Sequence, residues 1–85
     1  MKDIKFEEVQ DLLNKSNNID EIFDKVHVCD NLFYLVSLNG YYNYVTLDME
    51  LLSPYKWFES ASIFYSDGYA GVKYNSRAKR TALTG

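Results

Sequence analysis

The stretch LVSLNGYYNYVTLD, residues 35–48, decides the fold of this chain. Asn39 and Gly40 stand between two runs of apolar and tyrosine residues, and Asn-Gly is a strong local signal for a two-residue type I′ turn. Such a turn joins two antiparallel strands and sets their register. The pairs that it predicts are Leu38 with Tyr41, Val36 with Asn43, Tyr34 with Val45, and Leu32 with Leu47.

The predicted hairpin has two unlike faces, because successive side chains of a strand point to opposite sides of the sheet. The paired residues form an almost wholly apolar face, which we expect toward the core. Asn43 lies on that face, so its buried amide needs hydrogen-bond partners. The opposite face is rich in hydroxyl groups, and we expect it to be half exposed. Its residues are Phe33, Leu35, Ser37, Tyr42, Tyr44 and Thr46.

A second turn of the same kind is predicted at Asp67-Gly68. The pairs that follow from it are Tyr65 with Ala70, Ile63 with Val72, and Ala61 with Tyr74. Between the hairpins, Leu51-Leu52 can form a short strand, which Pro54 ends because proline has no N–H for a ladder. Together these segments predict a small antiparallel β-meander of about four or five strands.

The first quarter of the chain has helical spacing, with apolar residues recurring every three or four positions from residue 6 to residue 13. Asp3 is the predicted N-cap of the first turn. Asn18, with a glutamate three residues later, starts a second helical stretch in the manner of a capping box. We predict a helical segment over residues 1–26, formed by two short helices or one kinked helix that ends near Lys25. The fold class is therefore α+β.

Composition predicts one small globular domain. The chain has 85 residues, of which 47% are hydrophobic and 16% aromatic, and this is too apolar for a disordered tail. A single cysteine excludes an internal disulfide. No run approaches the ~18 apolar residues of a membrane span, and residues 1–10 lack the apolar core of a secretory signal. We expect a soluble, cytoplasmic protein that makes no membrane contact.

The net charge of −3 conceals an uneven distribution of charge. Residues 1–25 carry seven acids and four bases, residues 26–72 five acids and one base, and residues 73–85 four bases and no acid. The bases at the end are Lys73, Arg77, Lys79 and Arg80. They form a basic tail that is either frayed or paired with acidic helices of this chain or of a second copy. Direct nucleic-acid binding is disfavoured, because the acidic remainder would repel a polyanion.

The chain also repeats itself weakly at an offset of 36 residues, which places residues 36–39 (VSLN) on residues 72–75 (VKYN). Residues 39–75 resemble the WG (KWG) β-repeats of bacterial proteins, over about one unit from Leu32 to Asn75. The elements that carry the resemblance are Asn39-Gly40, Tyr42-Asn43, Tyr44-Val45, Asp48, Trp57-Phe58, Phe64, Gly68, Ala70 and Val72. The resemblance implies short antiparallel strands and a binding or scaffolding role without enzyme activity.

Two departures from the family pattern affect this interpretation. The Trp-Gly pair that names the family is Tyr42-Asn43 here, and the next copy dissolves after Asn75. Repeat units normally cover their apolar faces with neighbours, so in this chain the helices would have to cover the sheet. The resulting division is a helical segment at 1–26, a WG-like β unit at 28–75 and a basic tail at 76–85, all in a single domain of residues 1–85.

No pattern in the sequence predicts catalysis, a cofactor or a metal site. His27 and Cys29 would share one side of a strand, as half of a metal site or as a nucleophile with its base, but no second His or Cys completes the set. We interpret them as a surface His beside a buried Cys. Asp48 and Glu50 fit a solvated turn. The glycines, at 40, 68, 71 and 85, form no phosphate loop.

The eight tyrosines are the best functional indication, because a core this small cannot supply partners for all of their hydroxyl groups. The leading hypothesis is a non-catalytic module that binds another protein through an exposed aromatic face of the sheet. Its contact residues are Tyr42, Tyr44, Tyr55, Trp57 and Phe58. A second copy of the chain, pairing at a free sheet edge near Val72, is a further candidate partner.

The alternative hypothesis is a small acidic inhibitor of the type that phages use against host nucleases or defence complexes, as anti-CRISPR proteins do. It would occupy a basic nucleic-acid-binding surface by charge complementarity. The acidic face that it would use consists of Glu7, Glu8, Asp11, Asp20, Glu21 and Asp24.

Overall fold

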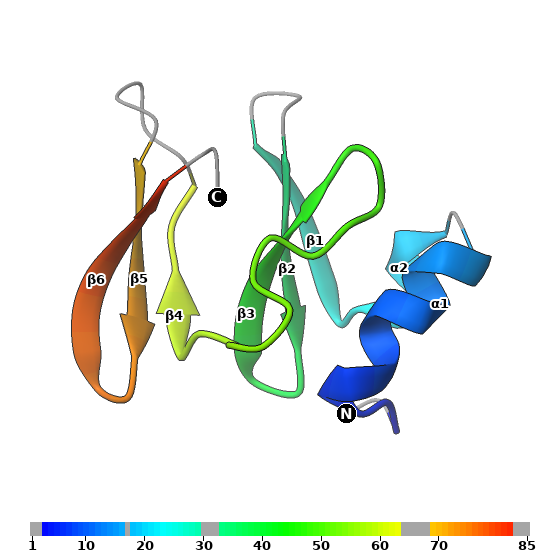
Figure 1. Ribbon diagram of the computed structural model, residues 1–85, viewed down its shortest axis with the longest axis horizontal. Coiled ribbons are helices and arrows are strands. Elements are labelled where there is room, and N and C mark those ends of the chain that lie inside the picture. Colours follow the sequence, from blue (N-terminus) through cyan, green and yellow to red (C-terminus); the bar gives the residue numbers. More distant parts are fainter. Residues whose placement is uncertain (1–2, 17, 30–32, 64–68, 83–85) are drawn as a thin grey trace.

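The chain folds into a short helical segment followed by two antiparallel sheets of three strands each (Figure 1). This computed structural model describes residues 3–16, 18–29, 33–63 and 69–82. The helices are the 3₁₀-helix η1 (Phe6–Glu8), α1 (Val9–Lys15) and α2 (Ile19–Ile22). The first sheet holds β1 (Lys25–Cys29), β2 (Phe33–Leu38) and β3 (Tyr41–Thr46), and the second holds β4 (Ser60–Ala61), β5 (Tyr69–Tyr74) and β6 (Arg77–Ala82). The predicted α+β class is confirmed, but the prediction of one meander is wrong.

The helical segment is shorter than predicted. Helix α2 ends at Ile22, because Phe23 turns to an extended backbone with ψ 156° and Lys25 already opens β1. Asp3 is not an N-cap; that position before η1 belongs to Lys5, whose N–H donates to Glu8 Oε1 at 3.4 Å. Among the described residues, none of these helices has the length and apolar character needed to cross a membrane.

The Asn39-Gly40 hairpin forms in the predicted register. Leu38 pairs with Tyr41, Val36 with Asn43 and Tyr34 with Val45, whereas the outermost predicted pair involves Leu32, which is outside the described residues. Asn39 and Gly40 both have positive φ, 52° and 87°, as a type I′ turn requires. The Asn39 N–H donates to Asp24 Oδ2 at 2.7 Å, so the preceding segment holds the turn in place.

The hairpin face predicted to be half exposed is buried at three of its six positions, where the prediction is wrong. Tyr44 is fully buried, and Phe33 and Ser37 are 8% exposed, whereas the other three residues are half-buried as predicted. One face packs on the helices in a first core that contains Val9, Leu13, Ile19, Ile22, Phe23, Val36, Leu38, Val45, Leu51 and Trp57. The other packs on the second sheet in a second core that contains Cys29, Phe33, Tyr44, Phe58, Ala70 and Val72. The first sheet is thus the middle of three layers (Figure 1).

The second sheet departs from the predicted register. Ala61 pairs with Val72, not with Tyr74, and Ser60 pairs with Lys73. The predicted corner at Asp67-Gly68, with Tyr65 beside it, lies outside the described residues. Strand β5 is central, with β4 on one side and β6 on the other. The strand at Val72 is therefore not an edge strand, and the edge strands of this sheet are β4 and β6.

Residues 77–82 are not a tail but the strand β6. It pairs with β5 along its length, from Tyr74 with Arg77 to Tyr69 with Ala82. The connecting residues Asn75 and Ser76 have positive φ, 51° and 61°. Asn75-Ser76 lies 36 residues after Asn39-Gly40, and both residues of each turn have positive φ. The weak sequence repeat therefore corresponds to a repeated strand–turn–strand arrangement.

Ser76→Gly should stabilise the protein, raising its free energy of unfolding by about 0.5–1 kcal/mol. Left-handed backbone costs an ordinary residue roughly 1–2 kcal/mol and costs glycine much less. The Ser76 N–H that donates to Glu59 Oε1 at 3.1 Å is retained in the variant. Urea denaturation followed by circular dichroism measures the change.

Gly40→Ala is the converse control. No atom lies within 4 Å of a Cβ added at Gly40, so the expected loss of about 1 kcal/mol comes from the backbone alone. A Ser76→Gly variant less stable than the parent would contradict the turn assignment.

Candidate binding surface

Three of the five aromatic residues predicted to bind a partner are buried. Tyr44 is fully buried, Phe58 is 6% exposed and Trp57 is 8% exposed. Tyr42 is half-buried. Only Tyr55, at 94% exposed, extends fully into solvent. The expectation of an exposed face is therefore wrong for Tyr44, Trp57 and Phe58.

Backbone pairing along the edge of β3 explains this burial. Leu52 N–H donates to Tyr44 O at 2.8 Å, and Tyr42 and Phe58 exchange hydrogen bonds of 2.8 and 2.9 Å. The segment 51–58 is thereby attached to β3 at both of its ends, with bends and a turn between the two bridges. At the second bridge the consecutive side chains Trp57 and Phe58 point to opposite faces. Trp57 enters the first core, and Phe58 enters the second, 6.4 Å between ring centroids from Tyr44.

Asn43 fixes the same segment through its buried amide. Its Nδ2 donates to Ser53 O at 2.8 Å, and its Oδ1 accepts from Tyr44 N–H at 2.8 Å. The prediction that this side chain needs partners on the core face is confirmed. On the other side, Gln10 of α1 donates to Met49 O at 3.1 Å and accepts from Leu51 N–H at 2.9 Å. Helix and strand together position residues 49–58.

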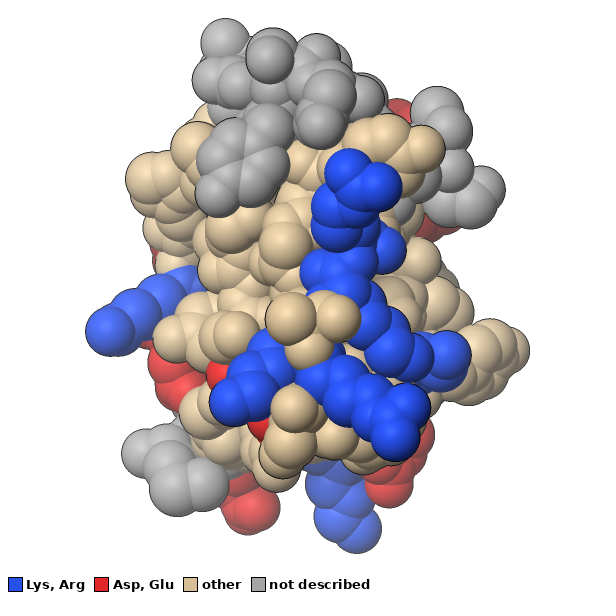
Figure 2. Space-filling view, turned by 90° about the vertical axis from the view of Figure 1, so that its left-hand side faces the viewer, with Lys and Arg blue, Asp and Glu red and all other residues tan. Residues whose placement is uncertain are grey.

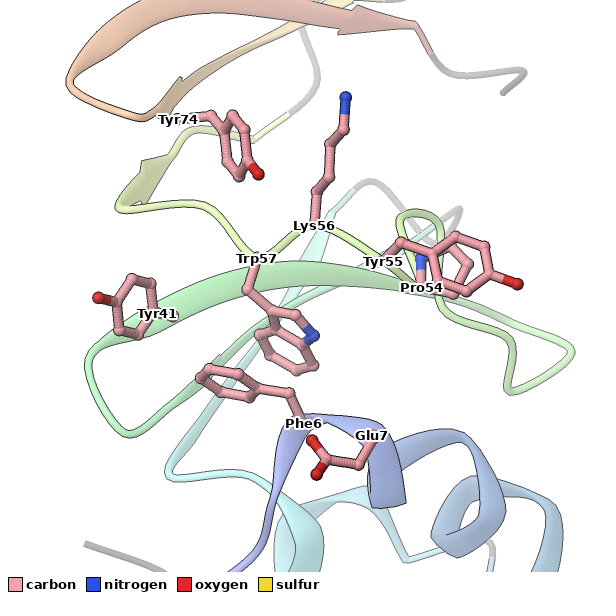
Figure 3. A pocket seen from close by; sticks show the side chains of 8 residues that line it. All are labelled: Phe6, Glu7, Tyr41, Pro54, Tyr55, Lys56, Trp57 and Tyr74. Carbon is pink, nitrogen blue, oxygen red and sulfur yellow. The ribbon is translucent and has the colours of Figure 1, made fainter.

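An aromatic hollow of about 390 Å³ lies where η1, β3 and residues 54–57 meet (Figure 3). We call it the aromatic groove. Its apolar walls are Phe6, Tyr41, Pro54, Tyr55, Trp57 and Tyr74, and Glu7 and Lys56 supply its charges. The indole of Trp57 stacks on Phe6, with ring centroids 4.6 Å apart and an angle of 16°, and Phe6 meets Tyr41 edge-on at 5.6 Å.

The groove combines buried rings with exposed ones. Phe6 and Trp57 form a fixed base, whereas Tyr41 is 42% exposed and Tyr55 94% exposed. The indole Nε1 of Trp57 is buried and has no hydrogen-bond partner among the described residues. Sequence reasoning found Tyr55 and Trp57 but missed Phe6, Tyr41 and Tyr74. No local signal distinguishes them, because only the tertiary fold brings three distant segments together.

The six acidic residues of the alternative hypothesis are all exposed, on or directly after the helices. They are Glu7, Glu8, Asp11, Asp20, Glu21 and Asp24. Glu8 accepts a hydrogen bond from Lys5 N–H, and Asp24 accepts one from Asn39 N–H at the hairpin turn. Asp24 is therefore part of the hairpin as well as of the acidic surface.

The remaining residues considered for chemistry lie apart from the groove. His27 is exposed on β1, and Cys29 is 4% exposed in the second core. Asp48 and Glu50 are exposed around the turn after β3. Within the described ranges, no group of three or more His, Cys, Asp or Glu side chains is placed to hold a metal ion.

Comparisons of this chain with protein-family models, with curated proteins and with solved structures find no match. The resemblance to WG repeats therefore stays a prediction from the sequence.

Proposed function

We propose that this chain is a non-catalytic protein-binding module whose contact surface is the aromatic groove. The observation that carries this proposal is Tyr55, whose side chain is 94% exposed at the rim of the groove, across from Tyr41 at 42% (Figure 3). A tyrosine that protrudes this far gives up most of the apolar burial available to it. Tyrosine and tryptophan are also the residues that most often dominate binding energy at protein interfaces.

The construction of the groove supports the same proposal. Its base is rigid because Phe6 and Trp57 stack, and its wall at residues 54–57 follows a segment held by backbone hydrogen bonds to β3. A preformed surface loses little conformational entropy on binding. A volume of about 390 Å³ suits one or two side chains of a partner, as in the anchor pockets of protein interfaces.

Affinity capture with three forms of the protein tests the proposal. Tyr55→Ala should lose the partner that the parent protein retains, with affinity reduced at least about tenfold if Tyr55 contributes as an interface anchor. Leu47→Ala is the matched control, since Leu47 is 50% exposed but does not line the groove. Both changes should leave stability within about 0.5 kcal/mol. Equal retention of the partner by Tyr55→Ala and Leu47→Ala would refute the groove as the contact surface.

The acidic inhibitor remains a second candidate because all six of its carboxylates are exposed at one end of the molecule. A double variant, Asp11→Asn and Asp20→Asn, should then strongly reduce capture of the partner, and binding by the parent should weaken steeply with salt. Glu7 is left unchanged because it also lines the aromatic groove, and Asp24 because it holds the hairpin turn. Capture that survives the double variant and high salt would rule out this candidate.

A further inference from the structure

A second hollow, of about 250 Å³, adjoins the aromatic groove, and its lining is positively charged rather than aromatic. Three cations line it: Lys56, Lys79 and Arg80. Lys56 and Tyr74 line both hollows, so the two form one continuous surface. We call the second hollow the cationic pocket.

Two of these cations come together from separate parts of the fold. Lys79 comes from β6 and Lys56 from the segment attached to β3, and their Nζ atoms lie 6.0 and 5.5 Å from the centroid of the same ring, Tyr74. Arg80 follows Lys79 on β6, so its guanidinium points to the other face of the sheet, where Cζ lies 4.9 Å from the centroid of Tyr69. Such cation–π contacts stabilise a cation without neutralising its charge. The pocket therefore keeps its positive potential.

No aspartate or glutamate is among the described residues that line the cationic pocket, and the hydroxyl-bearing residues Ser53 and Thr81 border it. Figure 2 shows Lys and Arg side chains running across the end of the molecule that the second sheet forms, away from the helices. Positive residues on β6 also protect an open sheet edge from pairing with other strands. Edge protection accounts for Lys79 and Arg80 but not for Lys56, which is outside the sheet.

We propose that the cationic pocket receives the carboxylate of an aspartate or glutamate in a partner peptide whose apolar side chain occupies the aromatic groove. This inference rests on the proposed function and names its ligand: an extended peptide with an acidic residue beside an aromatic or aliphatic anchor. The two hollows meet at Lys56 and Tyr74, so two neighbouring side chains of one peptide can fill both. A carboxylate between Lys56 and Lys79 gains charge-assisted hydrogen bonds, which are stronger than neutral ones.

The same surface is less suited to a nucleic acid. Glu7 lines the aromatic groove and is exposed, so a polyanion that continued from the cationic pocket into the groove would meet a carboxylate. Two cations also neutralise few phosphates, and nucleic-acid affinity depends on the number of phosphates that are neutralised. A peptide with one acidic residue carries its negative charge at a single position. This matches a surface whose cations lie in the cationic pocket and not along the whole aromatic groove.

Selection from a phage-displayed library of random 12-residue peptides on the intact protein tests the inference. Selected peptides should be enriched in Asp or Glu within two residues of an aromatic or aliphatic anchor. The affinity of the best peptide, measured by fluorescence anisotropy, should fall about tenfold in Lys79→Glu. Lys73→Glu is the matched control: it makes the same charge change on the same sheet at an exposed residue outside the pocket. Its effect should stay below about twofold at physiological salt.

Three outcomes would overturn the inference. Peptides that lose binding in Tyr55→Ala but show no acidic enrichment and no response to Lys79→Glu would refute the cationic pocket and leave the proposed function standing. Failure to select any Tyr55-dependent peptide, while capture still yields a Tyr55-dependent protein, would refute the peptide ligand alone. A single-stranded oligonucleotide of 20 thymidines that binds in a Lys79-dependent manner, more tightly than any selected peptide, would reassign the pocket to nucleic acid.

Discussion

Trp57→Ala should lower the free energy of unfolding by about 3–5 kcal/mol, as truncating a large core aromatic does. The indole is 8% exposed, stacks on Phe6 and lies 6.4 Å between centroids from Phe23. It therefore connects the helical segment to the first sheet and the groove segment. Since small domains have total stabilities near 5–15 kcal/mol, much of the variant should be unfolded at moderate temperature. Urea denaturation followed by far-ultraviolet circular dichroism measures the loss.

Trp57→Phe separates the packing of this side chain from its polar atom. Phenylalanine keeps a ring against Phe6 and removes Nε1, which is buried without a partner among the described residues. An unsatisfied buried donor costs about 1–3 kcal/mol, so its removal should offset much of the lost contact area. We expect Trp57→Phe to stay within about 2 kcal/mol of the parent. A Trp57→Phe variant as unstable as Trp57→Ala would show that the indole is satisfied and specifically required.

Tyr44→Ala should destabilise the protein by a similar amount, about 3–5 kcal/mol, through the second core. Tyr44 is fully buried on β3, packs near Phe58, and its hydroxyl group donates to Ser62 O. This side chain joins the first sheet to Ser62, which directly follows β4 of the second sheet. Its truncation leaves a cavity between the sheets and also removes this hydrogen bond. Thermal and urea unfolding should both report the loss.

Two further variants give the controls for Tyr44. Tyr44→Phe removes only the hydroxyl group and should cost about 1–2 kcal/mol, because the carbonyl of Ser62 loses its donor. Tyr42→Phe changes the same group at a half-buried position on the same strand and should cost less than about 0.5 kcal/mol. Equal losses in Tyr44→Phe and Tyr42→Phe would contradict the inter-sheet hydrogen bond.

The first hairpin was predictable because its information is local. Asn39 and Gly40 tolerate positive φ, the turn that they form sets the register, and alternation then places each side chain on one face. Asn75 and Ser76 form a turn of the same sense with a poorer residue at the second position. The sequence repeat at an offset of 36 residues aligned Asn75 with Asn39. The basic residues that follow were nevertheless predicted to be a tail, because lysine and arginine do not favour a strand by composition.

The burial of the second face of the hairpin was not predictable, because burial depends on what packs against it. Hydroxyl-bearing residues on one side of a strand predict a half-exposed face. Tyr44 is buried nevertheless, because the second sheet covers it and its hydroxyl group donates to Ser62 O. Long-range packing also explains why part of the predicted contact surface is buried. Trp57 and Phe58 resembled interface residues by composition, and the pairing of their segment with β3 turned them inward.

The sequence by itself determined the α+β class, the register at Asn39-Gly40, the requirement of Asn43 for partners and the separation of acidic from basic residues along the chain. Each of these depends on conformational preference or composition over a few consecutive residues. The tertiary structure alone decided that the strands divide into two sheets, that residues 77–82 pair as β6, and that Phe6, Tyr41, Tyr55 and Tyr74 surround one groove beside Lys56, Lys79 and Arg80. The physical reason is that packing between layers and the convergence of distant side chains are set by long-range contacts, which no local pattern encodes.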